Sequence, residues 1–77
     1  MLNDLESLPT AAGRTVKQGK RKFSRITFWR YVQREPDLGV RIGGRHFMWR
    51  VCREALNQGQ TLAEAAEIGR RCHARLR

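Results

Sequence analysis

Residues 39–50, GVRIGGRHFMWR, place a glycine pair between two short runs in which apolar and basic residues alternate. Successive side chains of an extended chain point to opposite faces, so Val40 and Ile42 share one face of the first run. Gly43 and Gly44 can take the positive φ angles that a two-residue hairpin turn requires. The pattern therefore predicts a β-hairpin. Its second run returns Phe47 and Trp49 to the buried face, and the residues expected at or near the outer surface are Arg41, Arg45, His46, Met48 and Arg50.

The segment before the hairpin, SRITFWRYVQRE (24–35), has the clearest helical pattern in the chain. Ser24 is a favourable N-cap residue, and Pro36 ends the helix because it lacks an N–H and restricts the residue before it to extended geometry. One apolar stripe is formed by Phe28, Tyr31 and Val32, with Phe23 just before it. The residues that then face outward are Arg25, Ile26, Trp29, Arg30 and Gln33.

Two more helices are predicted after the hairpin. The first covers 51–58 and is closed by Gly59, and the second covers 61–77 and begins with Thr61 and Glu64 at the spacing of a capping box. Residues expected to face inward are Val51, Ala55 and Leu56 in the first helix and Leu62, Ala65, Ala66, Gly69, Cys72 and Leu76 in the second.

The stripe of the last helix leaves two interpretations open. It can dock on the domain's own core, or it can offer a surface to a neighbouring copy of the chain. On the outer side of this helix, Glu67 and Arg71 have the i, i+4 spacing of an ion pair.

The N-terminal part has weaker patterns. Residues 1–10 contain Asp4 and Glu6 and are predicted to form an acidic, flexible terminus. A helix is expected to start at Thr10 as its N-cap, although the glycines of this segment weaken it. Its buried positions would be Ala12, Val16 and, beyond it, Phe23.

Length and charge limit the class of protein. A chain of 77 residues leaves room for one small core and for no deep cofactor pocket. It carries 16 Lys and Arg against 7 Asp and Glu, a net charge of +9, and residues 11–34 contain bases but no acid. Such a charge favours a polyanionic partner, with nucleic acid as the leading candidate. We expect no catalytic residues, no cofactor and no small-molecule substrate.

The remaining composition indicates a cytoplasmic setting. Residues 1–10 resemble no secretory signal, and no apolar run is long enough to span a membrane. Cys52 and Cys72 are expected as small core residues, with an intermolecular disulfide as the alternative. Together with His46 and His73 they lack the spacing of a zinc site, so no metal is expected.

The residues 23–56 resemble the MerR-type winged helix-turn-helix of small excisionases and AlpA-like regulators. The family pattern runs Ser-Arg-x-Thr-aromatic-x-Arg, a spacer, Val-x-Ile-Gly-Gly-Arg and a closing Trp-Arg. The matching positions are Ser24, Arg25, Thr27, Phe28, Arg30, Val40, Ile42, Gly43, Gly44, Arg45, Trp49 and Arg50. The chain departs from the family in having Lys22-Phe23-Ser24 where a Gly-Val-Ser turn is usual, and in continuing with an extra helix.

The resemblance implies a fold and a function. The fold would be α+β, mostly α: a winged helix-turn-helix domain over 11–58, with a two-stranded hairpin as the wing, followed by the C-terminal helix 61–77. The function would be that of a recombination directionality factor, which binds tandem sites beside an attachment site on double-stranded DNA, bends the DNA and favours excision by a site-specific integrase of the tyrosine recombinase type. A nucleoid-associated location follows. An AlpA-like transcription regulator is the alternative with the same domain.

The expected contacts fall into three groups. The helix would read the major groove, the wing would approach the minor groove, and a basic run before the helix would meet phosphates. The helix residues are Ser24, Arg25, Thr27, Trp29, Arg30 and Arg34, the wing residues are Arg41, Gly43, Gly44, Arg45 and His46, and the phosphate contacts are Lys17, Lys20, Arg21 and Lys22.

Each group also has a plainer interpretation. The helix arginines can be an ordinary solvated face, the wing can be a simple turn with a solvated Arg45, and Trp29 can pack against the wing instead of lying near the DNA backbone. RNA is a remote alternative partner, because single-stranded RNA readers expose several aromatic residues on one platform and the aromatic residues here fall mainly on predicted core faces.

Overall fold

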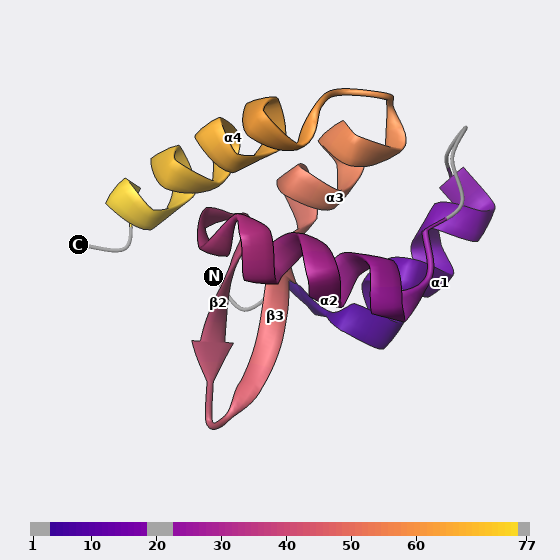
Figure 1. The fold of residues 1–77 in the computed structure, drawn as a ribbon, viewed down its shortest axis with the longest axis horizontal. Coiled ribbons are helices and arrows are strands. Elements are labelled where there is room, and N and C mark those ends of the chain that lie inside the picture. The colour runs from indigo at the N-terminus through magenta and orange to yellow at the C-terminus, as the bar shows by residue number, and fades with distance from the viewer. Residues whose placement is uncertain (1–3, 19–22, 76–77) are drawn as a thin grey trace.

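The computed structural model describes residues 4–18 and 23–75, which form a small α+β structure that is mostly helical (Figure 1). This confirms the predicted fold class at that level. The elements follow in the order β1 (Leu5–Ser7), α1 (Leu8–Gln18), α2 (Arg25–Arg34), the 3-10 helix η2 (Pro36–Leu38), β2 (Gly39–Ile42), β3 (Arg45–Trp49), α3 (Arg50–Asn57) and α4 (Leu62–Arg75). The strands form an antiparallel sheet in the order β1-β3-β2, so β3 is central. No helix within the described ranges is long and apolar enough to cross a membrane.

The N-terminal strand corrects the prediction of a flexible terminus over 1–10. Leu5 pairs with Trp49 and Ser7 with Phe47 in the sheet. Glu6 lies between Leu5 and Ser7 in the chain and is buried. Its carboxylate accepts hydrogen bonds from Arg53, with Nε–Oε1 at 3.0 Å and Nη2–Oε2 at 3.2 Å. The acidic residue is therefore part of the interior, because a buried arginine neutralises it.

Helix α1 begins at Leu8, earlier than the predicted start at Thr10. The Ser7 hydroxyl accepts a hydrogen bond from the Thr10 backbone N–H at 3.4 Å and so takes the capping role expected of Thr10. Pro9 is tolerated because the N–H groups of a first helical turn have no partner within the helix. Leu8, Ala11 and Thr15 are buried in this helix, whereas the predicted Ala12 is half-buried and the side chain of Val16 lies outside the described part.

Helix α2 has the predicted bounds and cap. The Ser24 hydroxyl accepts a hydrogen bond from the Thr27 N–H at 3.1 Å, and the helix ends at Arg34, two residues before Pro36. Phe28 and Val32 are buried and Tyr31 is half-buried, which confirms the apolar stripe. Pro36 then starts the short helix η2, which the sequence analysis does not predict.

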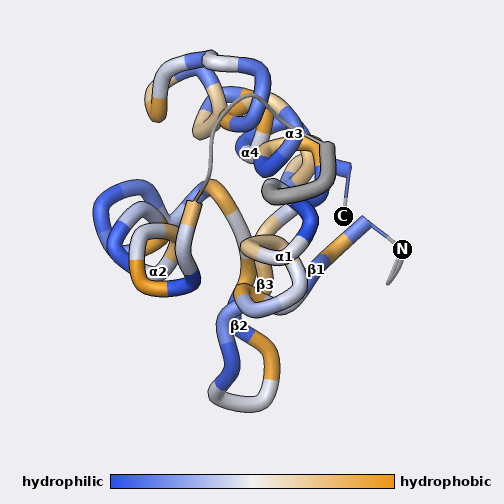
Figure 2. The backbone as a smooth tube through the Cα atoms, turned by 90° about the vertical axis from the view of Figure 1, so that its right-hand side faces the viewer, coloured by the Kyte–Doolittle hydropathy of each residue, from blue (hydrophilic) through white to orange (hydrophobic). Residues whose placement is uncertain are grey.

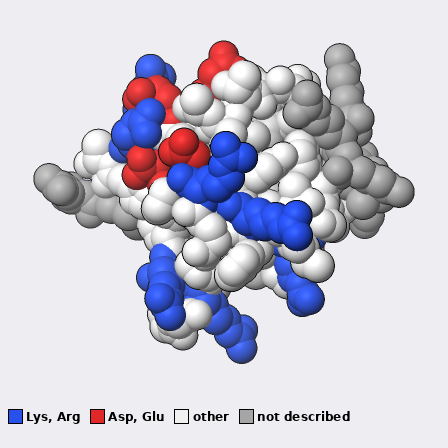
Figure 3. All heavy atoms as spheres, in the orientation of Figure 1, with Lys and Arg blue, Asp and Glu red and all other residues white. Residues whose placement is uncertain are grey.

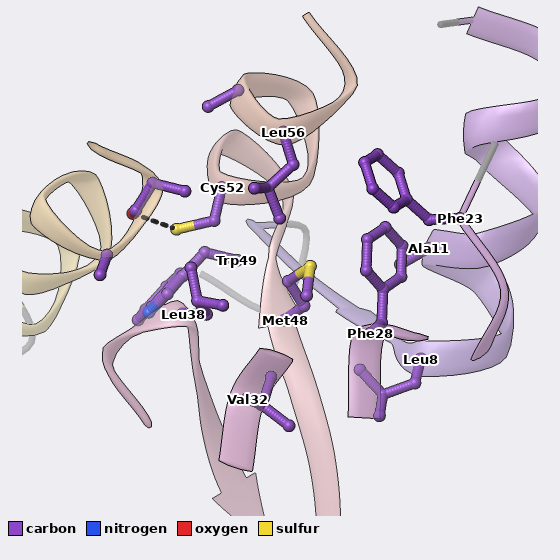
Figure 4. Close-up of a cluster of buried hydrophobic side chains, with 13 residues drawn as sticks. Leu8, Ala11, Phe23, Phe28, Val32, Leu38, Met48, Trp49, Cys52 and Leu56 are labelled. Atoms are coloured by element: carbon purple, nitrogen blue, oxygen red, sulfur yellow. Dashed lines mark hydrogen bonds between the residues drawn. The ribbon is translucent and has the colours of Figure 1, made fainter. Parts of the chain in front are cut away.

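The hairpin has the predicted turn but a different buried face. Gly43 and Gly44 have φ angles of 56° and 80°, and Ile42 pairs with Arg45. Met48, predicted outside, is fully buried, and Ile42, predicted inside, is 47% exposed. The reason is the central position of β3. Its last residues are covered on both faces, so that Met48 lies among helix side chains while Trp49 lies under α4, and the far end of the hairpin extends beyond the core (Figures 1 and 4).

One hydrophobic core joins the helices to the sheet (Figure 4). The rings of Phe23 and Phe28 stack with centroids 5.1 Å apart, which fixes the chain entering α2. Figure 2 shows α2 on one side of the sheet. The described residues near the two termini lie close to each other on a different side of the sheet, where Asp4 and Arg75 line one hollow. The fully or nearly fully buried apolar residues include Ala11, Phe28, Leu38, Met48, Cys52, Leu56, Ala65 and Ala66.

Helices α3 and α4 close the other end of this core. Val51, predicted inward, is 39% exposed, and the adjacent Cys52 is buried instead. The predicted cap of α4 is confirmed by reciprocal hydrogen bonds, from the Glu64 N–H to the Thr61 hydroxyl at 3.1 Å and from the Thr61 N–H to Glu64 Oε1 at 2.8 Å. Gly59 has the positive φ, 98°, expected after the end of α3.

The apolar stripe of α4 packs on the domain's own core. Ala65, Ala66 and Gly69 are buried, and a Cβ atom on Gly69 would collide with the carbonyl oxygen of Asp37 in η2. The predicted ion pair of Glu67 with Arg71 is wrong: Glu67 pairs with Arg70 at 3.2 Å, because Arg70 also reaches Asp37 at 3.0 Å. Of the two interpretations of this helix, docking on its own domain is therefore the one observed.

Candidate nucleic-acid interface

Helix α2 presents a basic and partly apolar face to solvent. The side chains opposite the buried Phe28 and Val32 are exposed, with Ile26 at 60% and Trp29 at 50%. The exposed residues of this helix also include the predicted contact residues Arg25, Arg30 and Arg34. Helix packing produces this face, because the residues at i and i+4 of the buried stripe leave the remaining positions outside.

Ser24 and Thr27 serve the helix itself. Their hydroxyl oxygens are 2.9 Å apart and the Ser24 hydroxyl also caps the Thr27 N–H. Ser24 is exposed and Thr27 half-buried, so both lie at the start of the outward face. A phosphate at this end would meet the first N–H groups of α2 beside Arg25.

The hairpin tip is exposed from Arg41 to Arg45. Positive φ angles at the two glycines allow a turn without side chains, so the backbone between Ile42 and Arg45 can approach another molecule closely. His46 is half-buried behind the tip. The hairpin therefore carries a basic residue on each strand at a narrow, glycine-tipped end.

Helix α2 and the hairpin line one groove. Its walls come from α2, from β3 and from the start of α1, so the groove joins parts of the chain that are distant in sequence. The lining residues are Ser7, Leu8, Pro9, Arg25, Ile26, Trp29, Arg45, His46 and Phe47. Trp29 thus lines the groove beside the hairpin and is still 50% exposed. This position is compatible with packing against the wing and with a contact to the DNA backbone.

Not all predicted contact residues belong to this groove. Arg30 and Arg34 are exposed on α2 outside it, and Arg41 lines a smaller hollow that also includes Val32, Val40 and His46. The side chain of Lys17 in α1 and the residues Lys20, Arg21 and Lys22 lie outside the described part of the chain. Five lining residues of the groove are not predicted as contacts, and Ile26 is the one of them that belongs to α2; the five are Ser7, Leu8, Pro9, Ile26 and Phe47. The sequence signal that could have indicated Ile26 is that an isoleucine stands outside the apolar stripe of its helix.

The charges around the groove are unbalanced. Among the described residues, the ion pairs join Glu6 to Arg14 and Arg53, Asp4 to Arg50, and Arg70 to Asp37 and Glu67. None of these pairs includes an arginine of α2 or of the hairpin. The basic side chains of both elements that Figure 3 shows in blue are all arginines. The positive charge on this side is therefore available to an anionic ligand.

The cysteines and histidines form no metal site in the part of the chain that the structure describes. Within the described ranges, no group of three or more His, Cys, Asp or Glu residues could hold a metal ion. Cys52 is buried, and its thiol donates a hydrogen bond to the Ala65 carbonyl at 3.2 Å. Burial raises the pKa of the Cys52 thiol to about 12, with smaller contributions from Cys72 and Asp37, so the thiol is neutral.

Comparison of the chain with protein-family models, with curated proteins and with solved structures gives no match.

Proposed function

We propose that this chain binds duplex DNA as a winged helix-turn-helix protein, with α2 in the major groove and the β2–β3 hairpin as a wing at the adjacent minor groove. The observation that carries the proposal is the groove shared by Arg25 and Trp29 of α2 and Arg45 of the hairpin. A DNA backbone strand runs between two adjacent grooves, so a protein that enters both must present two projections with a basic channel between them.

The charge distribution supports the same ligand. Four of the seven acids, Asp4, Glu6, Asp37 and Glu67, form ion pairs with arginines outside α2 and the hairpin. No arginine of α2 or of the hairpin belongs to an ion pair in the described part of the chain. Contacts to phosphates provide most of the affinity of such proteins and make it dependent on salt. Arginine forks on a helix can in addition read guanine edges in the major groove.

The biological role that we propose is that of an excisionase-like accessory protein in the cytoplasm, associated with the nucleoid. It would bind tandem sites beside an attachment site, bend the DNA and act with a tyrosine-type integrase. This part rests on the resemblance of 23–56 to small excisionases. Transcription regulation by the same domain is the second candidate, and a footprint that lies at a promoter instead of an attachment site would favour it.

Arg45→Ala tests the wing. The variant should bind duplex DNA about tenfold more weakly, because one arginine at the minor groove is lost while the exposed tip leaves the fold unchanged. Arg71→Ala is the matched control, since it removes the same charge from an exposed position on α4 outside the groove. The measurement is a gel-shift titration at one salt concentration.

Two outcomes would contradict the proposal. Equal affinities of Arg45→Ala and Arg71→Ala would remove the hairpin from the interface. Tighter binding of the wild-type protein to single-stranded RNA than to duplex DNA, in the same buffer, would replace DNA by RNA as the ligand.

A further inference from the structure

Two exposed apolar side chains lie side by side on the outward face of α2. Ile26 and Trp29 are 60% and 50% exposed, and these are the highest values among the large hydrophobic residues that the structure describes. They are one helical turn apart and belong to the α2 wall of the groove shared with the hairpin, the wall that enters the major groove in the proposed complex. A single exposed apolar residue needs no explanation, but a pair at the start of a basic helix indicates a contact surface.

The position of this pair within α2 matters. Ile26 is the second residue of the helix, and the N-terminal residues of a recognition helix are those that reach base edges. Arg25 and Arg30 are exposed next to the pair. An isoleucine has no hydrogen-bonding group, so it gains nothing from a phosphate or from a polar base edge.

Duplex DNA offers one apolar group in its major groove, the C5 methyl group of thymine. We infer that Ile26 and Trp29 contact thymine methyl groups, so that α2 selects sites in which thymine lies next to the guanine bound by Arg25 or Arg30. This inference rests on the proposed function and adds the sequence class of the DNA. It also separates DNA from RNA, because uracil lacks this methyl group.

The test replaces single thymines by deoxyuridine. A duplex site is first selected from a random pool with the wild-type protein, and each thymine of that site is then exchanged for deoxyuridine, which removes one methyl group and keeps the base pairing. We expect one or two exchanges within the pairs covered by α2 to weaken wild-type binding about fourfold each, the factor for burying one methylene-sized group. Exchanges outside those pairs should have no effect.

Protein variants complete the experiment. Ile26→Ala should lose about fourfold in affinity for the thymine site and should no longer distinguish thymine from deoxyuridine at the position it contacts, and Trp29→Ala should do the same at its own position. Val51→Ala is the matched control, because Val51 is 39% exposed and lies on α3 outside the groove. It should discriminate like the wild type.

The two proposals fail in different ways. If the wild-type protein selects and binds a duplex site but shows equal affinity for every deoxyuridine exchange, or if the selected site has no thymine under α2, the thymine inference is overturned and the DNA-binding function stands. If no duplex site is selected from the pool, both are overturned.

Discussion

Glu6 shows how one residue changes the structure of a terminus. Its carboxylate is 5% exposed and contacts Arg53, which is 1% exposed, and Arg14, at 3.2 Å. From the sequence, Glu6 is predicted to be solvated, because its partner Arg53 lies 47 residues away and local patterns do not indicate the pair. The buried pair of Glu6 and Arg53 joins β1 to α3, and for this reason the predicted flexibility is wrong for the described residues 5–10.

Replacing Glu6 by Gln should destabilise the protein strongly. The substitution keeps the size of the side chain but removes the negative charge from its buried pair with Arg53, and breaking a buried ion pair typically costs about 3 kcal/mol or more of unfolding free energy. Urea denaturation followed by circular dichroism measures this change. Asp4→Asn is the control: the Asp4 and Arg50 side chains are largely exposed and 3.7 Å apart, so the cost should stay below about 1 kcal/mol. Equal costs would contradict a structural role of the buried pair.

At the scale of elements, the structure agrees with the sequence at four local signals. The Ser24 cap, the end of α2 before Pro36, the Gly43-Gly44 turn and the capping box of α4 each depend on residues within one turn of each other. Their chemistry is complete in a short segment. These elements also carry most of the candidate interface, so the exposed arginines of α2 and the hairpin could be predicted.

The predictions that failed depend on tertiary packing. Met48 and Ile42 exchange their expected environments because β3 is the central strand, and nothing in the hairpin itself reveals that β1 pairs with it. Val51 is exposed and Cys52 is buried because α3 packs against α4 with the face that carries Cys52. The groove between α2 and the hairpin, with Ile26 in it, is likewise a product of packing between distant segments.

The contact between α3 and α4 predicts a protected thiol. Cys52 is fully buried and its thiol donates a hydrogen bond to the Ala65 carbonyl (Figure 4). Cys72 is partly exposed. At pH 8, iodoacetamide should therefore modify Cys72 much faster than Cys52 in the folded protein, and peptide mapping by mass spectrometry resolves the two. In urea both should react at similar rates. Equal reactivity without urea would contradict the packing of α4 on α3.

The same thiol gives a pH dependence of stability. The pKa of Cys52 is about 12 in the folded protein against 9.0 for an ordinary thiol, so the unfolded chain loses this proton first as the pH rises. Its contribution is complete below about pH 9 and is lost between pH 9 and 12. In Cys52→Ala this part of the alkaline loss should be absent, which denaturant titrations at pH 8 and pH 10.5 would measure.

At the scale of the whole molecule, charge and packing divide the structure into two parts. The described ion pairs tie β1 to α1 and α3, and α4 to η2, while the arginines of α2 and the hairpin are outside these pairs and two of them, Arg25 and Arg45, line one groove. The net charge of +9 predicts a polyanionic partner, and counting charges along the chain locates part of the basic face. The role of α4 could not be predicted, since its stripe fits either its own core or a second copy.

Removal of residues 61–77 should unfold the protein. The truncation deletes Ala65, Ala66 and Gly69 from the core and uncovers Cys52 and Leu38, and a domain of this size has little apolar area to spare. Far-UV circular dichroism at 25 °C should show loss of helix well beyond the deleted segment.

A substitution in α4 tests the same point without shortening the chain. Ala66→Asp places a carboxylate in the core and should destabilise the protein severely, whereas Ala63→Asp, one turn earlier at an exposed position, should have little effect. For the truncation of residues 61–77, one outcome would contradict the prediction: the shortened chain stays folded and binds one DNA site, but no longer binds several sites cooperatively. That result would move the stripe of α4 from the domain's core to a contact between neighbouring copies on DNA.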